Sequence, residues 1–130
     1  MKVPPSPFAE LVGLSIDEQA SGRSTLSLRV APRHLNPHGV VHGAVLYALA
    51  DTGMGAALYP TLSPGEICAT IEIKISYFRP VWAGAVVCRT EVLNRGKIVA
   101  NLDSRIYADD ELVAQANGHY AIIKRRTAAP

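Results

Sequence analysis

One carboxylate stands alone in a long uncharged stretch of the sequence. Between Gly43 and Gly65, tyrosines aside, the only ionisable residue is Asp51, and its neighbours are alanine, leucine, threonine, glycine and methionine. Aspartate has a low helix propensity, and burial of an unpaired carboxylate is strongly unfavourable. An acid retained in such surroundings indicates a chemical role, as a general base or as a nucleophile.

A polar segment precedes this acid. Residues 36–43 read Asn-Pro-His-Gly-Val-Val-His-Gly, and a helix is expected to run from His42 or Gly43 to Tyr59, where Pro60 ends it. The first N–H groups of a helix have no acceptor within it and lie at the positive end of its dipole. The Gly43 N–H could therefore stabilise negative charge developing on a carbonyl oxygen, and the missing Cβ would allow close approach.

Structural explanations exist for the same residues. Asn36 is an ordinary turn former, and His42 could simply cap the helix. Gly39 and Gly43 could serve only positive φ angles or close packing. Asp51 could be a helix acid that a donor from a loop satisfies.

The spacing of three histidines suggests a metal site. His34, His38 and His42 are four residues apart, but Pro37 and Gly39 oppose a continuous helix there. No cysteine or acid completes a ligand set. We therefore expect no metal and no cofactor. The sequence also lacks G-x-S-x-G, which disfavours a serine hydrolase.

The rest of the sequence predicts the elements that must position these groups. A short helix is expected after Ser6-Pro7, ending at Gly13. Apolar and polar residues alternate over 24–30, 67–78, 85–93, 97–107 and 112–123, which predicts strands. Short turns between successive strands favour an antiparallel meander.

The predicted sheet has one polar face, so its other face must cover something apolar. The polar face carries Arg29, Glu72, Lys74, Arg89, Glu91, Asp103 and Arg105. Only the helix expected up to Tyr59 is long and apolar enough to lie under the other face. The fold class is therefore expected to be α+β, with a curved antiparallel sheet of about five to six strands wrapped around one long central helix.

The helix itself suggests self-association. Ala44, Ala48, Asp51, Gly55 and Leu58 lie near one stripe of it. One subunit cannot cover this stripe as well as the side that faces the sheet. A partner subunit is therefore expected over the stripe.

Size and charge limit the class of protein. The chain has 130 residues and a mass of 13.9 kDa, which predicts one domain over residues 1–130. A net charge of +2 is too weakly basic to indicate nucleic acid, and the tail from about 124 to 130 is expected to be flexible. No signal peptide or membrane span is recognised, so a cytoplasmic protein without membrane association is expected.

The order and spacing of these residues resemble the hotdog-fold acyl-CoA thioesterases. The similar group is the phenylacetate-pathway (PaaI-like) and thioesterase superfamily member 2 type. Its pattern, N-x-x-G-x-x-H-G-G with an Asp nine positions after the His, is matched by Asn36, Gly39, His42, Gly43 and Asp51. Tyr-x-Arg-Pro at 77–80 and the glycine at position 84 match a later family element. Alanine at position 44 departs from the second glycine of the pattern.

The resemblance implies hydrolysis of an acyl-CoA to the free acid and coenzyme A, in a homodimer or a dimer of dimers. Asp51 would come from one subunit and act as general base or nucleophile. Asn36, His42 and Gly43 would face it from the other subunit. Asn36 would hold the attacking water or the carbonyl region, and His42 would help seat the thioester or the departing sulfur.

Two further sets of residues are candidates by the same resemblance. Thr70 matches a family serine that helps position water, although strand alternation places it with the solvent-side Glu72 and Lys74. Coenzyme A carries several phosphates, so cationic groups should line its path. The candidates for substrate and coenzyme A binding are Gly39, Arg79, Arg95, Gly96 and Lys97. The turn at 95–97 is equally explained as a solvated hairpin tip.

Two other functions on the same fold stay open. A non-catalytic acyl-CoA binding module would gain nothing from Asp51 beside a thioester. A hydratase or dehydratase usually needs a buried histidine as well as a helix acid, and no histidine follows His42 in the helix. The sequence does not separate aryl from medium-chain acyl groups.

Overall fold

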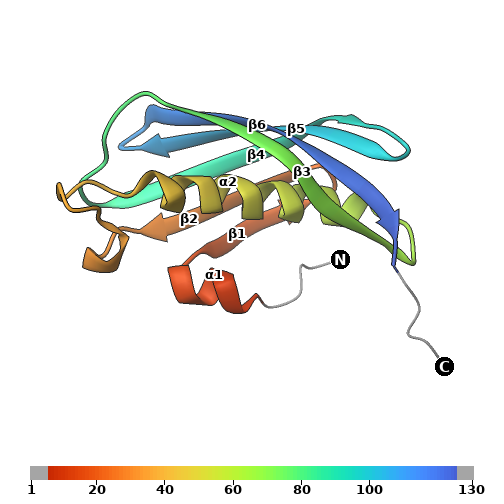
Figure 1. Ribbon diagram of the computed structural model, residues 1–130, viewed down its shortest axis with the longest axis horizontal. Coiled ribbons are helices and arrows are strands. Elements are labelled where there is room, and N and C mark those ends of the chain that lie inside the picture. Colours follow the sequence, from red (N-terminus) through yellow and green to blue (C-terminus); the bar gives the residue numbers. More distant parts are fainter. Residues whose placement is uncertain (1–5, 126–130) are drawn as a thin grey trace.

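A six-stranded antiparallel sheet curves around one long helix, which confirms the expected fold class (Figure 1). The computed structural model describes residues 6–125. The elements in chain order are α1 (Pro7–Val12), β1 (Ser15–Ala20), β2 (Arg23–Arg29), η1 (Pro32–His34), α2 (Gly43–Leu58), η2 (Tyr59–Thr61), β3 (Glu66–Tyr77), β4 (Ala85–Arg95), β5 (Val99–Ala108) and β6 (Glu111–Lys124). Strand β1 has no clear alternation of burial, which is why the sequence pattern did not reveal it.

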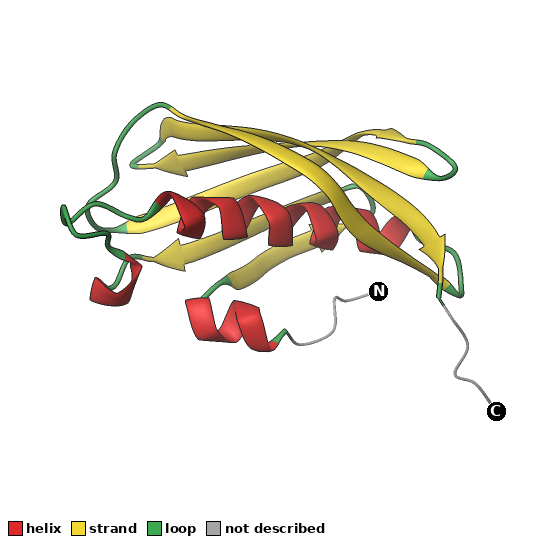
Figure 2. Cartoon of the chain, in the orientation of Figure 1, coloured by secondary structure: helices red, strands yellow, loops and turns green. Residues whose placement is uncertain are grey.

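The strands lie in the order β1-β2-β4-β5-β6-β3, and all neighbours are antiparallel. Short turns join β4, β5 and β6 as predicted, but β3 pairs with β6 at the far edge of the sheet. The prediction of a simple meander is therefore wrong for β3. The reason is that α2 runs between β2 and β3 along the concave face, about 24 Å for its 16 residues, and carries the chain to the opposite edge (Figure 2).

Helix α2 packs closely against the sheet at Gly53. A Cβ on this residue would lie 2.8 Å from the Thr90 Oγ1, so only glycine allows this approach. The buried hydroxyl of Ser24 also donates to the Gly53 carbonyl oxygen at 2.7 Å. The face of α2 opposite Asp51 is accordingly buried: Leu46, Leu49, Gly53 and Ala56.

The hairpin between β1 and β2 satisfies the carbonyl groups near the C-terminal end of α2. The Gln19 side chain donates to the Ala56 carbonyl oxygen, and the Gly22 N–H donates to that of Ala57, both at 2.9 Å. Helix termini require such external partners. The β1–β2 hairpin therefore holds the C-terminal end of α2.

Strand β3 contains a bulge that changes which residues face the helix. Thr70 pairs with Tyr120, and Glu72 pairs with the adjacent His119, so Ile71 is the extra residue. Ile71 is 57% exposed, whereas Thr70 turns toward α2. The predicted alternation, with Ile71 inward and Thr70 on the solvent side, is therefore wrong at this point.

The C-terminal end of the sheet is longer than predicted. β6 extends to Lys124, which pairs with Glu66, so the first residue of the predicted flexible tail belongs to a strand. Residues 126–130 of that tail lie outside the described residues. Among the described helices, none has the length and apolar character that crossing a bilayer requires.

Candidate active site

Asp51 is half-buried at the middle of α2, and its carboxylate accepts hydrogen bonds from side chains of the sheet. The Thr70 hydroxyl on β3 donates to Asp51 Oδ1 at 2.9 Å. The Tyr120 hydroxyl on β6 also donates to Oδ1 and lies 2.9 Å from the Asp51 main-chain oxygen. No described residue donates to Oδ2, so the carboxylate has one occupied and one open oxygen.

Tyr120 is buried, with 3% of its surface exposed. Burial raises the pKa of its phenol, and the hydrogen bond to Asp51 raises this pKa further. The phenol therefore stays protonated and acts as a donor to the carboxylate. Cys68 on β3 also faces Asp51, and burial, followed by the charge of Asp51, raises the pKa of its thiol.

The N-terminus of α2 presents a free N–H group. His42 is the N-cap, and its Nδ1 accepts from the Ala44 N–H at 2.9 Å. Because Nδ1 accepts, the proton of the neutral ring is on Nε2, and the ring is exposed. No described residue accepts from the Gly43 N–H, so this group is available at the positive end of the helix dipole.

Strand β3 contacts this terminus as well. The Tyr77 hydroxyl donates to the Gly43 carbonyl oxygen at 2.7 Å. Within one chain, β3 therefore contacts both candidate residues of α2. Tyr77 binds Gly43, and Thr70 binds Asp51.

Asn36 organises the loop before the helix. Its Oδ1 accepts from the N–H groups of His38 at 2.9 Å and Val40 at 3.2 Å, which leaves its amide NH₂ for another acceptor. Gly39 has a φ of +80°, the left-handed conformation that favours glycine, and its N–H donates to the Asn36 carbonyl oxygen. The side-chain oxygen of Asn36 thus shapes the loop, and only its NH₂ group could contact a substrate.

Of the three spaced histidines, His34 has a structural role. His34 is 3% exposed: its Nδ1 accepts from the Ala31 N–H, and its Nε2 lies 2.6 Å from the Val12 carbonyl oxygen. It therefore holds α1 against the loop. The described residues contain no group of three His, Cys, Asp or Glu that could hold a metal ion.

Within one chain, Gly43 and Asp51 are too far apart to act on the same thioester. They are eight positions apart in one continuous helix, which corresponds to about 12 Å along its axis. The structure therefore brings Asp51 together with Thr70 and Tyr120, and Gly43 together with His42 and Tyr77, as two separate groups.

The candidate cations lie at opposite ends of the molecule. Arg79 follows β3 near the helix N-terminus, is exposed, and pairs with Glu111 at 3.5 Å. Arg95 lies at the other end, where it donates to Thr61 and pairs with Glu66 at 3.2 Å. At Gly96 a Cβ would lie 2.3 Å from the Val99 carbonyl oxygen, so the turn requires glycine, and Lys97 is exposed beside it.

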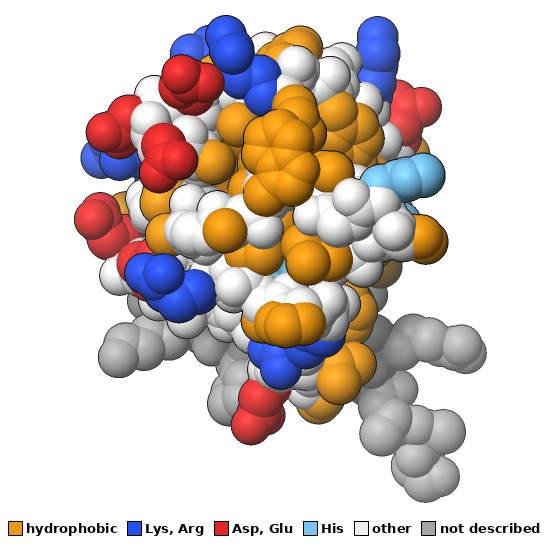
Figure 3. Space-filling model, turned by 90° about the vertical axis from the view of Figure 1, so that its left-hand side faces the viewer, with side chains coloured by type: hydrophobic (Ala, Val, Ile, Leu, Met, Phe, Trp, Pro, Cys, Tyr) orange, Lys and Arg blue, Asp and Glu red, His pale blue; other side chains and the backbone are white. Residues whose placement is uncertain are grey.

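The end of the molecule that carries the helix N-terminus has an apolar centre. Figure 3 shows hydrophobic side chains gathered across this end. The Val41 N–H donates to the Val81 carbonyl oxygen at 2.8 Å and holds residues 78–84 beside the loop before α2. Phe78 and Trp82 in this segment are 52% and 61% exposed. An apolar surface therefore adjoins the free Gly43 N–H.

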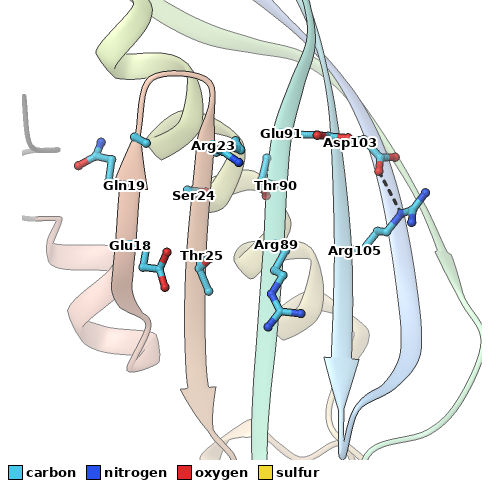
Figure 4. Close-up of a pocket in the computed structure, with 11 residues that line it drawn as sticks. Glu18, Gln19, Arg23, Ser24, Thr25, Arg89, Thr90, Glu91, Asp103 and Arg105 are labelled. Carbon is cyan, nitrogen blue, oxygen red and sulfur yellow. Dashed lines mark ion pairs between the residues drawn. The ribbon is translucent and has the colours of Figure 1, made fainter.

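A hollow of about 480 Å³ lies on the other face of the sheet (Figure 4). Charged side chains from neighbouring strands line it, among them Arg23, Arg89, Glu91, Asp103 and Arg105. Helix α2 lies on the opposite side of the sheet, so the sheet separates this hollow from Asp51.

Sequence reasoning missed Tyr120 and assigned no role to Tyr77 beyond a motif match. A signal for Tyr120 was its place on the inward face of the last strand, because a buried tyrosine hydroxyl needs a hydrogen-bond partner. The bulge at Ile71, which brings Thr70 to Asp51, has no comparable signal in the sequence.

The chain is similar in sequence to proteins of a known family. The model of the thioesterase superfamily matches residues 38–115, which include His42, Gly43, Asp51 and Thr70. The acyl-coenzyme A thioesterase PaaI of Escherichia coli is 30% identical over 99 residues, which are 75% of this chain and 69% of that protein. The 1,4-dihydroxy-2-naphthoyl-CoA hydrolase of Listeria monocytogenes is 25% identical over 118 residues, 90% of this chain and 96% of that protein.

A solved structure extends the similarity to three dimensions. A mutant of the phenylacetic acid degradation protein PaaI from Thermus thermophilus superimposes with a TM-score of 0.82 at 32% identity. The superposition covers 89% of this chain and 98% of that one.

Proposed function

The chain belongs to the thioesterase superfamily, and from this membership we propose that it hydrolyses an aryl- or medium-chain acyl-CoA to the free acid and coenzyme A. One observation carries the proposal: an Asp51 carboxylate with one open oxygen and a Gly43 N–H without an acceptor lie on the same helix. The names of the relatives support the substrate class, since one is an acyl-CoA thioesterase and the other hydrolyses an aromatic acyl-CoA.

A second copy of the chain would bring the two groups together. Of the predicted stripe of α2, Ala44 is exposed and Asp51 and Gly55 are half-buried, as is the neighbouring Tyr47. Ala48 and Leu58 are buried within the chain, so the prediction that a partner must cover them is wrong for these two residues. β3 is an edge strand of 12 residues beside this stripe, and long free edges favour pairing with another strand. In a two-fold dimer with antiparallel helices that cross near Tyr47, midway between Gly43 and Asp51, Asp51 of one subunit would face the helix N-terminus of its partner. A dimer of such dimers is the larger assembly we propose.

The chemistry follows from the groups available. The Gly43 N–H would bind the thioester oxygen as negative charge develops on it, with help from the helix dipole. Asp51 would take a proton from the attacking water or attack the carbonyl carbon itself. The Nε2–H of His42 would donate to the thioester or to the departing sulfur, and the NH₂ group of Asn36 would hold the water or the carbonyl region.

Coenzyme A would lie across the two subunits at one end of the dimer. Antiparallel helices place Arg79 of one subunit at the same end as the turn with Arg95, Gly96 and Lys97 of its partner. Lys97 and Arg79 would then supply the phosphate contacts, because Arg95 is held by Thr61 and by a half-buried pair with Glu66, whereas the pair of Arg79 with Glu111 is exposed. Gly39 would let the loop before the helix approach the pantetheine arm.

Release of free thiol from a panel of benzoyl-, phenylacetyl- and octanoyl-CoA tests the proposal. Asp51→Asn keeps the shape of the side chain and removes the base, so turnover should fall at least about a hundredfold while the fold persists. Tyr107→Phe, on the polar face of the sheet, is the matched control and should keep the wild-type rate. Wild-type rates in Asp51→Asn would eliminate the mechanism, and tight binding without thiol release by the wild type would identify a binding module instead.

A further inference from the structure

Tyr120 reaches Asp51 from a strand that lies 69 residues further along the chain. It sits on the inward face of β6, between Thr70 on β3 and Ala100 on β5. Its hydroxyl contacts both the main-chain oxygen and the carboxylate of Asp51. The phenol therefore bonds the side chain and the backbone of one helical residue at once.

Two donors converge on the same carboxylate oxygen. Tyr120 and Thr70 both donate to Oδ1, and no described residue donates to Oδ2. Donors on one oxygen fix the torsion of the carboxylate and use the lone pairs of that oxygen. The lone pairs of Oδ2 stay available for a water proton or for a carbonyl carbon.

We propose that Tyr120 is a positioning residue for this hydrolysis: its hydroxyl fixes the Asp51 side chain and, together with Thr70, selects Oδ2 as the reacting oxygen. The inference rests on the proposed function, since it assigns a role within the same reaction. The site would then require a hydrogen-bond donor at position 120. A phenylalanine there would fill the same space without supplying that donor.

The surroundings of Asp51 keep the Tyr120 phenol protonated, as a permanent hydrogen-bond donor must be. Among residues 6–125, the titratable groups whose pKa responds to Asp51 are Tyr120 on β6 and Cys68 on β3. Burial raises the pKa of both groups, so both remain protonated and neutral over the working range of the enzyme.

Tyr120→Phe tests the inference through the pH profile of thiol release. Loss of a donor to the carboxylate raises its pKa, so the acidic limb of kcat/KM should move upward by about half a unit to one unit. The kcat value should fall about tenfold, with KM changed less than twofold, because the acyl-CoA contacts are untouched. Tyr107→Phe removes a hydroxyl from the polar face and should leave profile and rate unchanged.

A second variant separates positioning from packing. Thr70→Val removes the other donor to Oδ1, so the double variant with Tyr120→Phe should shift the acidic limb further in the same direction than either single variant. If Tyr120 only fills space, both variants will change thermal stability without a further shift of the acidic limb. Tyr120→Phe will then keep the wild-type limb, and the double variant will keep the limb of Thr70→Val. That result would overturn the inference.

Carbon-13 NMR titration of the Asp51 carboxyl group makes the test independent of turnover. The resonance is assigned by its loss in Asp51→Asn, and it should titrate at higher pH in Tyr120→Phe. If the wild type releases no thiol while this shift is present, the proposed function fails and the interaction of Tyr120 with Asp51 stands. An unchanged titration overturns the inference whatever the activity.

Replacement of Tyr120 by 3-fluorotyrosine should shift the acidic limb in the opposite direction to Tyr120→Phe. It also keeps the shape of the residue, which matters if Tyr120→Phe does not fold. The fluorinated phenol is a stronger acid and a stronger donor, so the Asp51 titration and the acidic limb should both move downward. The absence of a shift, or a shift upward, would contradict the assigned role.

Discussion

The hydroxyl of Tyr77 donates to the carbonyl oxygen of Gly43 at 2.7 Å, and the same ring would crowd any side chain added at position 43. A Cβ at position 43 would lie 3.0 Å from Cζ and 3.1 Å from the hydroxyl oxygen of Tyr77. Strand β3 therefore fixes the first residue of α2 by a hydrogen bond on one side and by steric contact on the other.

Gly43→Ala should lower kcat/KM for thiol release about 10- to 100-fold. The added methyl group must push Tyr77 or the helix N-terminus aside by a few tenths of an ångström, which displaces the N–H proposed to bind the thioester oxygen. Stability should change by less than about 1 kcal/mol, because the better helix propensity of alanine offsets the crowding. Enzyme kinetics and urea unfolding measure the two effects separately.

The double variant Gly43→Ala with Tyr77→Ala is the control for this prediction. If crowding causes the loss, removal of the ring should restore part of the activity that Gly43→Ala loses. A Gly43→Ala enzyme with wild-type kcat/KM would show that the position of this N–H does not limit the reaction.

Gly53→Ala should destabilise the fold by about 1–3 kcal/mol, although alanine favours helices. A Cβ at position 53 would lie 2.8 Å from the Thr90 Oγ1, and Thr90 itself is held by a 2.6 Å hydrogen bond to Ser104. Urea unfolding measures the loss. The double variant with Thr90→Ala should be less destabilised than the sum of the two single variants, and strict additivity would argue against a direct clash.

The stability of the fold should depend on pH through the ionisation of Glu66. The hydrogen bond from the Ser63 N–H, helped by the charge of Arg95, lowers the pKa of this carboxyl below its usual 4.5. The unfolded state thus binds the proton at higher pH than the folded state, so the stabilisation is present above the unfolded pKa and is lost as the pH falls through the folded pKa. The difference in Tm between wild type and Glu66→Gln should be largest near neutral pH and should shrink in acid. A difference that grows on acidification would contradict this assignment.

Much of α2 and its carboxylate could be predicted from the sequence. The helix was expected from His42 or Gly43 to Tyr59, and it runs from Gly43 to Leu58 with His42 as its N-cap. These features are local, because the apolar run, the capping residue and the Pro60 stop lie within the helix or beside it. The buried face of α2 follows from the same periodicity.

The partners of Asp51 could not be predicted in the same way. Alternation along residues 67–78 shows that a strand is present, but it does not show that Ile71 is an extra residue that turns Thr70 toward the helix. β3 lies beside β6 because α2 ends near that edge of the sheet. The direction of α2 across the sheet is set by tertiary packing and not by local sequence. Tyr120 meets Asp51 only because of that placement.

Gly55→Arg tests whether a second subunit covers the stripe of α2 that carries Asp51. Within one chain, a Cβ at position 55 meets nothing within 4 Å, and almost any residue favours a helix more than glycine, so the isolated subunit should remain folded. A partner packed over Asp51 would meet the long charged side chain directly. Light scattering should give at least twice the 13.9 kDa of one chain for the wild type and a single-chain mass for Gly55→Arg, with thiol release lost.

Ser21→Arg in the exposed turn between β1 and β2 is the matched control, because it adds the same side chain away from the stripe. It should keep both the wild-type mass and the wild-type rate. The Gly55→Arg result is decisive because, in a single chain, about 12 Å of helix separates Gly43 from Asp51. If Gly55→Arg is monomeric and fully active, these two residues cannot act on one thioester, and the catalytic assignment of Gly43 must be abandoned.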